Sequence, residues 1–302
     1  MRFKKLDMNL LAALDVLLRT CNVSKAAEEM FITQSAMSNA LARLRTYFDD
    51  PLLIQVGRRM ELSPFAETIR DPLRDVMLRI ESTVITSPQF DPRTSTRELT
   101  IALSDYSLAV LGAALVQRLA DEAPLVRVNF RPQHATPGKL LERGEIDLLI
   151  APDFTAADSS VSETLYQDDI CVIACARSSH AGKVMDLERI TGAPHVVMEP
   201  FSGQESFAVI AAREAGLKLS PVVTTYAFNS IPDLVRGTDR IALLQRRLGQ
   251  KAAASGDFVL FDPPVALPRL SQTMQWLGHR ERDPGLVWLR GLVRACVDDM
   301  CP

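Results

Sequence analysis

The sequence lacks the short glycine motifs and long hydrophobic runs that identify many enzymes and membrane proteins. Its 14 glycines include no pair two residues apart, so no G-x-G-x-x-G dinucleotide-binding loop is present. Neither a G-x-x-x-x-G-K-S/T phosphate loop nor a G-x-S-x-G nucleophile elbow occurs. The longest stretch without a charged residue, 219–232, is shorter than the roughly 20 apolar residues of a membrane span. These absences argue against a nucleotide-binding enzyme, a serine hydrolase and a membrane protein.

Cysteine and histidine are scarce and scattered. The five cysteines are an odd number without the close spacing of zinc ligands, and the apolar segment 8–14 is bounded by Asp7 and Asp15 with no small-residue cleavage site after it. We therefore expect a reduced, cytoplasmic chain without a signal peptide. Cys171 and Cys175 are expected to be small buried residues rather than redox or metal ligands. The four histidines lack the spacing of metal ligands, so we predict no metal and no cofactor.

Positive charge is concentrated near the start of the chain. Residues 1–60 carry nine Lys and Arg residues against six acidic residues, whereas the whole chain has a net charge of −3. The rest of the chain therefore carries −6. A basic head on an acidic body is expected when one small domain contacts phosphate groups.

The first 62 residues predict short helices joined by tight turns. Leucines recur at the helical period, and residues of the N-cap type precede the later helical patterns. Asp50-Pro51 then ends the helical pattern. The predicted elements are a helix over 6–18, a second over 25–30 capped by Ser24, a third over 34–47 capped by Thr33, and a hairpin or wing over 52–62.

A longer helix is predicted to begin at Ser63-Pro64, an N-cap residue followed by proline at the first helical position. Apolar residues at 69, 73, 76, 80 and 84 form one narrow seam, the pattern of a pairing interface between two copies of the chain. Pro72 lies inside this helix, where proline costs about 3 kcal/mol or kinks the helix. The alternative is a helix that packs on its own domain.

After residue 92 the pattern changes to short apolar strands that alternate with helices. Such alternation indicates an α/β fold with parallel sheets of the doubly wound kind, and the length suits two lobes. Strands are predicted over 99–103, 126–130, 146–151, 170–176, 195–198, 222–225, 240–244 and 258–261, and helices over 108–122, 137–143, 205–215, 230–236 and 247–253.

The segment 33–45 has the pattern of a DNA-recognition helix. One face is apolar, while the other carries short hydroxyl and amide side chains with almost no charge, which suits base edges in a major groove. Arginines at its end and at the wing tip are placed to contact phosphates. The alternative is a structural three-helix unit with a polar face. The predicted DNA-binding residues are Ser24, Thr33, Gln34, Ser35, Ser38, Asn39, Arg43, Arg58 and Arg59.

These motifs resemble the LysR-type transcriptional regulators. The resemblance rests on the opening MRFKKLDMNLL, on SKAAEEM at 24–30 and on TQSAMSNALARLR at 33–45. The opening block and FDDPLL at 48–53 are similar to the branch that contains the nodulation activators and the regulators of aromatic-compound degradation. RGEIDLLI at 143–150 and a C-terminal pattern of Trp276, Asp283-Pro284 and Trp288-Leu-Arg290 extend the similarity over nearly the whole chain.

The resemblance implies a winged helix-turn-helix over 1–62, a dimerisation helix over 63–91 and an effector-binding domain over 92–302. That domain would be periplasmic-binding-protein-like, with one lobe from 92–163 and 267–302 and another from 164–266. It also implies homodimers or homotetramers that bind double-stranded promoter DNA, with RNA polymerase as a further partner. Gln55 and Val56 stand where many members have a wing arginine, so we expect phosphate contacts at Arg58 and Arg59 instead.

In open α/β sheets, ligands bind at the carboxyl ends of the strands, so the loops after the predicted strands are candidates for an effector site. The resemblance singles out five of these positions, Ser104, Thr136, Asp169, Ser202 and Arg247, and three aromatic residues favour an aromatic or phenolic inducer. The candidates are Ser104, Asp105, Tyr106, His134, Thr136, Asp169, Phe201, Ser202, Gly203, Phe228, Asn229 and Arg247.

The sequence thus predicts a DNA-binding transcriptional activator that a small aromatic or phenolic molecule controls. Two other classes are considered. A solute-binding protein fits the α/β body but neither the helix-turn-helix nor the expected lack of a signal peptide. An enzyme on the same lobes lacks a recognisable catalytic constellation. The identity of the inducer, the DNA site, and the choice between dimer and tetramer stay open.

Overall fold

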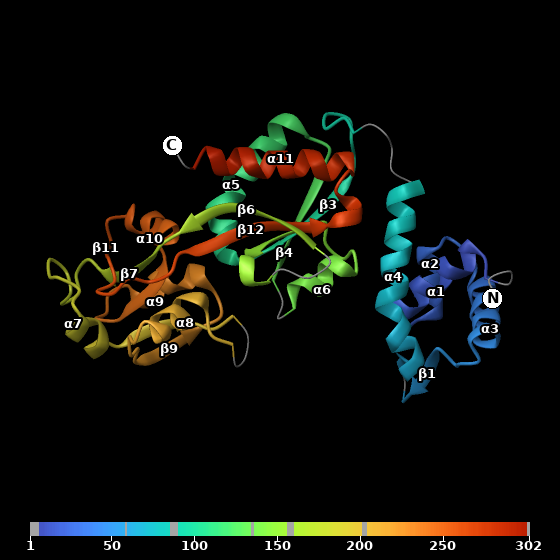
Figure 1. Cartoon of the computed structure of the whole chain (residues 1–302), viewed down its shortest axis with the longest axis horizontal. Coiled ribbons are helices and arrows are strands. Elements are labelled where there is room, and N and C mark those ends of the chain that lie inside the picture. Colours follow the sequence, from blue (N-terminus) through green and yellow to red (C-terminus); the bar gives the residue numbers. More distant parts are fainter. Residues whose placement is uncertain are drawn as a thin grey trace. The chain divides into compact units, whose positions relative to one another are not determined.

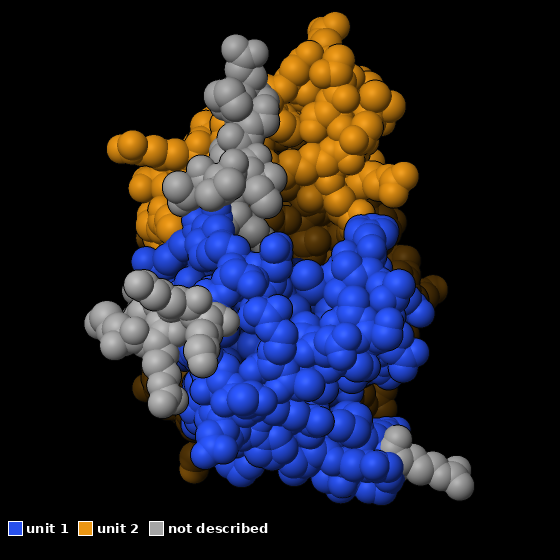
Figure 2. Space-filling view, turned by 90° about the vertical axis from the view of Figure 1, so that its right-hand side faces the viewer, with its two compact units in different colours: residues 1–88, 142–145 blue, residues 89–141, 146–302 orange. Residues whose placement is uncertain are grey.

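The chain forms two compact units, each with a hydrophobic core of its own. The computed structural model describes residues 6–57, 59–84, 90–133, 136–155, 160–200 and 204–300, with the backbone alone for 81–84. Figure 2 colours the two units: residues 1–88 with 142–145, and residues 89–141 with 146–302.

The first unit contains a helix-turn-helix, a β-hairpin and a long helix (Figure 1). Leucine and methionine side chains from its first three helices, among them Leu14, Met37 and Leu44, form the core. The predicted wing is present as an antiparallel pair of strands. The elements are α1 (Met8–Thr20), α2 (Val23–Glu29), α3 (Gln34–Phe48), β1 (Leu53–Val56), β2 (Arg59–Leu62) and α4 (Pro64–Val84).

Side-chain caps set the starts of the short helices. Thr33 caps α3 as predicted, because its hydroxyl accepts a hydrogen bond from the Ala36 backbone N–H at 3.2 Å. The prediction that Ser24 caps the second helix is wrong. Asn22 is the N-cap, and its side-chain oxygen accepts from the Lys25 N–H at 3.0 Å. Ser24 is the second residue of α2, two positions after the cap.

Helix α4 begins at the predicted proline signal, where the Ser63 hydroxyl accepts a hydrogen bond from the Ala66 N–H at 3.0 Å. Ile69 and Leu73, the first two residues of the apolar seam, pack on the core of the first unit. Val76, the next residue of the seam, is 45% exposed. The start of the seam therefore serves the unit's own core, and pairing of two copies through α4 stays a prediction.

The second unit contains two five-stranded sheets, each the centre of a lobe. The first lobe has the strand order β4-β3-β5-β12-β6. Its helices α5 and α11 pack against each other. The elements of this lobe are β3 (Glu98–Leu103), α5 (Asp105–Glu122), β4 (Arg127–Pro132), α6 (Pro137–Glu142), β5 (Leu148–Pro152), η2 (Asp153–Thr155), β6 (Ser160–Asp168), β12 (Leu270–Leu277), η4 (Gly278–Arg280) and α11 (Pro284–Asp298).

The second lobe has the strand order β11-β7-β10-β8-β9. Its three central strands, β7, β10 and β8, are apolar and buried, as expected for strands covered on both faces. The elements of this lobe are β7 (Ile170–Cys175), α7 (Leu187–Gly192), β8 (His195–Met198), α8 (Phe207–Glu214), β9 (Pro221–Thr225), η3 (Phe228–Ser230), α9 (Ile231–Val235), β10 (Ile241–Gln245), α10 (Arg246–Ala253) and β11 (Phe258–Phe261).

The chain crosses between the lobes twice, from β6 to β7 at Asp169 and from β11 to β12 over 262–269 (Figure 1). The first crossover is later than the predicted boundary after residue 163, because β6 continues beside β12 through Asp168. The predicted boundary at 266/267 falls inside the second crossover.

The prediction of parallel sheets is only partly right, because both sheets are mixed. Strand β12 runs antiparallel to β5 and β6, and β7 runs antiparallel to β10 and β11. Strands β6 and β12 were not predicted as strands. Both contain several Ser, Thr and Gln residues, so they lack the continuous apolar run that marked the other strands.

Candidate functional site

Helix α3 presents the polar face that its sequence predicts. Met37, Leu41 and Leu44 are buried in the core of the first unit. The residues of the opposite face that were predicted to contact DNA are all exposed: Gln34, Ser35, Ser38 and Asn39. A helix with a short, uncharged and hydrogen-bonding exposed face can enter a major groove and contact base edges.

The turn before α3 exposes an aromatic side chain that sequence reasoning missed. Phe31 is 96% exposed and has a left-handed backbone conformation with φ of 54°. Its ring therefore contributes nothing to the core of the first unit and is accessible beside the polar face of α3. Its signal in the sequence is a Phe-Ile pair between the two helices of the motif.

The arginines near the end of α3 have different environments. Arg43 is exposed and lies 3.5 Å from the carboxylate of Asp7. Arg45 instead donates hydrogen bonds to the backbone carbonyls of Pro51 at 2.8 Å and Leu53 at 3.0 Å. These hydrogen bonds hold the start of the wing against α3. At the wing, Arg59 is exposed, and Arg58 lies outside the described residues.

A cavity of about 450 Å³ lies between the two lobes of the second unit. This volume is within the range of small-molecule sites. Both sheets and the loops at their carboxyl ends contribute to its wall. The described lining residues are Leu103, Ser104, Asp105, Tyr106, Pro132, Gln133, Pro137, Pro152, Phe154, Thr155, Met198, Pro200, Gln204, Glu205, Ser206, Phe207, Tyr226, Ala227, Phe228, Gln245, Leu270 and Gln272.

Aromatic pairs connect the lobes at two sides of this interlobe cavity. Phe154 of the first lobe stacks on Phe207 of the second, with ring centroids 6.0 Å apart and planes inclined by 13°. Tyr106 meets Phe228 edge to face at 6.2 Å. A planar ligand between the lobes would therefore meet ring faces and edges from both of them.

Comparisons with known proteins match both units. The model of the bacterial regulatory helix-turn-helix protein, lysR family, matches residues 8–67, and the model of the LysR substrate binding domain matches residues 92–297. The chain belongs to the LysR family of bacterial transcriptional regulators. It is therefore a DNA-binding regulator, and its family is one of regulators rather than enzymes.

Several relatives of this LysR-family chain are nodulation proteins. It is 33% identical to nodulation protein D 1 of Bradyrhizobium elkanii over 97% of this chain and 94% of that protein. It is 34% identical to nodulation protein D 3 of Mesorhizobium japonicum over 97% of this chain and 98% of that protein. Among solved structures, a probable transcriptional regulator from Pseudomonas aeruginosa aligns with a TM-score of 0.65 at 26% identity, covering 97% of this chain and 98% of that chain. A full-length OxyR variant from the same organism aligns with a TM-score of 0.76 at 14% identity over 96% and 94%, a likeness of fold alone.

Four of the effector-site candidates line the interlobe cavity of this LysR-family regulator: Ser104, Asp105, Tyr106 and Phe228. The Ser104 hydroxyl also caps α5 by accepting a hydrogen bond from the Ser107 N–H at 3.1 Å. Asn229 does not line the cavity but joins the lobes beside it, because its N–H donates to the Asp105 carboxylate at 2.8 Å. His134, Phe201, Ser202 and Gly203 lie outside the described residues.

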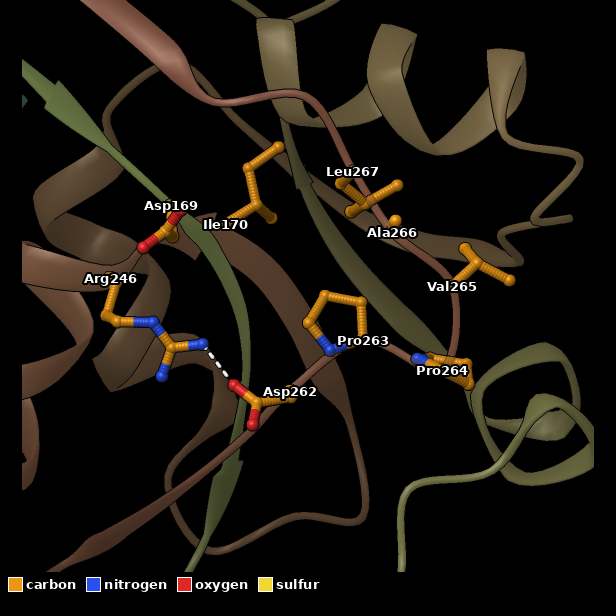
Figure 3. A pocket seen from close by; sticks show the side chains of 9 residues that line it. All are labelled: Asp169, Ile170, Arg246, Asp262, Pro263, Pro264, Val265, Ala266 and Leu267. Atoms are coloured by element: carbon orange, nitrogen blue, oxygen red, sulfur yellow. Dashed lines mark hydrogen bonds and ion pairs between the residues drawn. The ribbon is translucent and has the colours of Figure 1, made fainter.

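Three other candidates, Thr136, Asp169 and Arg247, do not line the interlobe cavity. Thr136 is an exposed residue before α6. Asp169 pairs with Arg269 at 2.9 Å and lines a separate open pocket of about 460 Å³ beside the crossovers (Figure 3). In that pocket Arg246 pairs with Asp262, as the dashed line in Figure 3 marks.

The third residue, Arg247, belongs to a buried network at the first crossover. Its backbone N–H faces the Asp168 carboxylate at 3.3 Å, and its guanidinium lies over the Tyr166 ring at 5.3 Å. The Tyr106 hydroxyl donates to the same carboxylate at 2.6 Å. Burial raises the pKa of Asp168, and the bonds from Tyr106 and Arg247 oppose that rise. The network joins α5 of the first lobe and α10 of the second lobe to Asp168 at the end of β6, where the chain crosses between the lobes.

Sequence reasoning also missed lining residues on strands, above all Gln245 and Gln272, because it considered the loops. Within the described ranges, no group of three or more His, Cys, Asp or Glu side chains is placed to hold a metal ion. No helix among these residues is both long and apolar enough to cross a membrane.

Proposed function

We propose that this chain is a cytoplasmic transcriptional activator that binds promoter DNA through α3 and the wing and is controlled by a small aromatic or phenolic inducer. The observation that carries the inducer proposal is the interlobe cavity, which has aromatic side chains from both lobes in its wall. The nodulation relatives support the role of activator.

The mechanism that we propose is a shift of population between open and closed arrangements of the lobes. Two contacts between the lobes favour the closed arrangement: Asn229 with Asp105, and the Lys251 ammonium with the Ala109 carbonyl at 2.8 Å. A ligand that contacts both lobes binds the closed arrangement more tightly and increases its population. In a homodimer or homotetramer, closure changes the spacing of the DNA-binding units, and hence the DNA bend and the contact with RNA polymerase.

The DNA-binding part is tested by selecting sites from random DNA with the full-length chain. We expect a recurrent sequence whose affinity falls steeply with salt, because Lys and Arg displace counterions from the phosphates. The inducer part is tested by a thermal-shift screen followed by footprinting and DNA-bend assays on the selected site. An inducer that raises transcription while it leaves both footprint and bend unchanged would contradict the mechanism.

A further inference from the structure

The positive charge of the first unit is partly offset by acidic side chains of the same unit. Arg19 of α1 pairs with Glu29 of α2 at 2.5 Å. Of the two arginines in α3, Arg45 donates hydrogen bonds to backbone carbonyls at the start of the wing. Arg43 is the other, and its exposed guanidinium lies beside the carboxylate of Asp7. An acidic residue therefore accompanies the α3 arginine that is most open to a phosphate.

Asp7 uses its two carboxylate oxygens for different partners. Its Oδ1 atom accepts a hydrogen bond from the Leu10 N–H at 2.8 Å and thereby caps α1. Its Oδ2 atom faces the guanidinium of Arg43 at 3.5 Å. Both side chains are more than half exposed, so this ion pair adds little to the stability of the fold. Its charges remain within reach of a molecule that binds α3.

Capping of α1 does not require the negative charge of Asp7. The next two helices of the same unit have neutral caps, Asn22 for α2 and Thr33 for α3. Asparagine and aspartate are about equally good caps, because either side chain offers an oxygen to the first turn. The charge of Asp7 instead acts on the polyanion that α3 binds, since each charge beside the phosphates changes the affinity for every DNA sequence.

We infer that Asp7 attenuates sequence-independent DNA binding by offsetting the charge of Arg43. This inference rests on the proposed function of α3 as the DNA-binding helix. Phosphate contacts supply essentially all of the affinity for random DNA, whereas base contacts add to them at a specific site. Offsetting one positive charge therefore weakens binding to the large excess of random sequence and leaves the hydrogen-bonding face of α3 unaltered.

The test is the substitution Asp7→Asn in the full-length chain. Asparagine keeps the Oδ1 atom that caps α1 and replaces the Oδ2 atom beside Arg43 with an uncharged NH2 group. Fluorescence anisotropy gives Kd for a random duplex and for a selected site. We expect Asp7→Asn to bind random DNA roughly two- to fivefold more tightly at about 50 mM salt, and to gain no more than this on the selected site.

The salt dependence identifies the cause of this gain. One additional positive charge increases the magnitude of the slope of log affinity against log salt concentration by about 0.9, so the gain should nearly vanish at about 200 mM salt. An unchanged or weaker affinity for random DNA would overturn the inference, and so would a gain that persists at the higher salt concentration. A larger gain on the selected site than on random DNA would show that Asp7 acts on a sequence-specific contact instead.

Asp186→Asn is the matched control. Asp186 caps α7 of the second unit by accepting a hydrogen bond from the Arg189 N–H at 2.8 Å, so the same charge is removed from the same kind of position. We expect this variant to bind DNA like the natural chain. Equal gains from both substitutions would show an effect of net charge alone and refute the role of Asp7.

Two further results separate this inference from folding and from the proposed function. Tm should be the same for Asp7→Asn and the natural chain, and Asp7→Ser provides a second neutral cap if the first variant is unstable. If the natural chain selects no sequence, the proposed reading of DNA by α3 fails. The comparison on random DNA still decides the role of Asp7 in that case.

Discussion

The hydrogen bond from Tyr106 to Asp168 supports a specific prediction about the stability of the second unit. The substitution Tyr106→Phe removes the hydroxyl that donates to the buried carboxylate at 2.6 Å and keeps the ring that meets Phe228. Asp168 then keeps only its longer backbone contacts, of which that to Arg247 is 3.3 Å. Because hydrogen bonds to charged groups contribute about 1.5–3 kcal/mol, we expect a loss of that size in the free energy of unfolding at neutral pH.

The measurement is urea unfolding followed by tryptophan fluorescence. Both tryptophans, Trp276 and Trp288, belong to the second unit, so their signal reports on that unit. Tyr226→Phe is the control, since Tyr226 is 84% exposed and the same atom is removed. If Tyr106→Phe costs no more than this control, within about 0.5 kcal/mol, the hydrogen bond does not stabilise the crossover.

The pH dependence gives a second check on the same bond. The pKa of Asp168 is raised in the folded chain by burial, so the folded state binds a proton more readily than the unfolded state. Stability from this group is therefore highest at low pH and falls as the pH rises from the ordinary pKa of about 3.9 through the folded pKa. Loss of the Tyr106 hydroxyl raises the folded pKa further. The difference in the free energy of unfolding between Tyr106→Phe and the natural chain should accordingly grow with pH.

Three further predictions concern DNA binding and acid stability. Asn39→Ala should cost about 1–3 kcal/mol on a selected site and little on random DNA in a fluorescence-anisotropy titration, and equal losses on both would count against base contact. Arg45→Met should weaken binding to both DNAs, because the wing loses its bonds to α3. The slope of log affinity against log salt concentration should stay unchanged, since Arg45 bonds backbone carbonyls rather than phosphates. A slope whose magnitude falls by about one would indicate a phosphate contact. Burial alone would raise the pKa of Asp283, but its 2.6 Å bonds from Arg97 hold it below the ordinary value, so this pair stabilises at neutral pH and the stabilisation is lost as the pH falls below about 4. Asp283→Asn should lower the urea midpoint at neutral pH. The difference in midpoint between this variant and the natural chain should become smaller in acid, and a difference that does not change with pH would contradict the prediction.

Local features of the first unit were predictable because they depend on neighbouring residues. The faces of α3, its Thr33 cap and the start of α4 at Ser63-Pro64 follow from helical periodicity and from capping by residues within one turn. The error at Ser24 has the same origin. Asn22 and Ser24 are both good caps, and the choice between them depends on where the preceding helix ends, which is at a left-handed Cys21.

The candidate ligand site was predictable only in part. Ser104, Asp105 and Tyr106 follow a strongly apolar strand, so the rule for strand ends located them. Arg247 follows a strand in the same way, yet it does not line the cavity. Its guanidinium lies over the Tyr166 ring, and its backbone N–H, in the first turn of α10, faces Asp168. Packing decides which residues after a strand face the cavity, and the apolar pattern of the strand in the sequence does not contain this information.

By itself, the sequence determined the helix-turn-helix, its exposed hydrogen-bonding face, the two-lobed α/β class and the family, because periodicity, capping and motif spacing are properties of short segments. Only the tertiary structure decided that Gln245 and Gln272, on strands of different lobes, line one cavity. The physical reason is the double crossover. It returns the chain to the first lobe as the antiparallel strand β12, and thereby places residues that no local pattern connects on the wall of the same cavity.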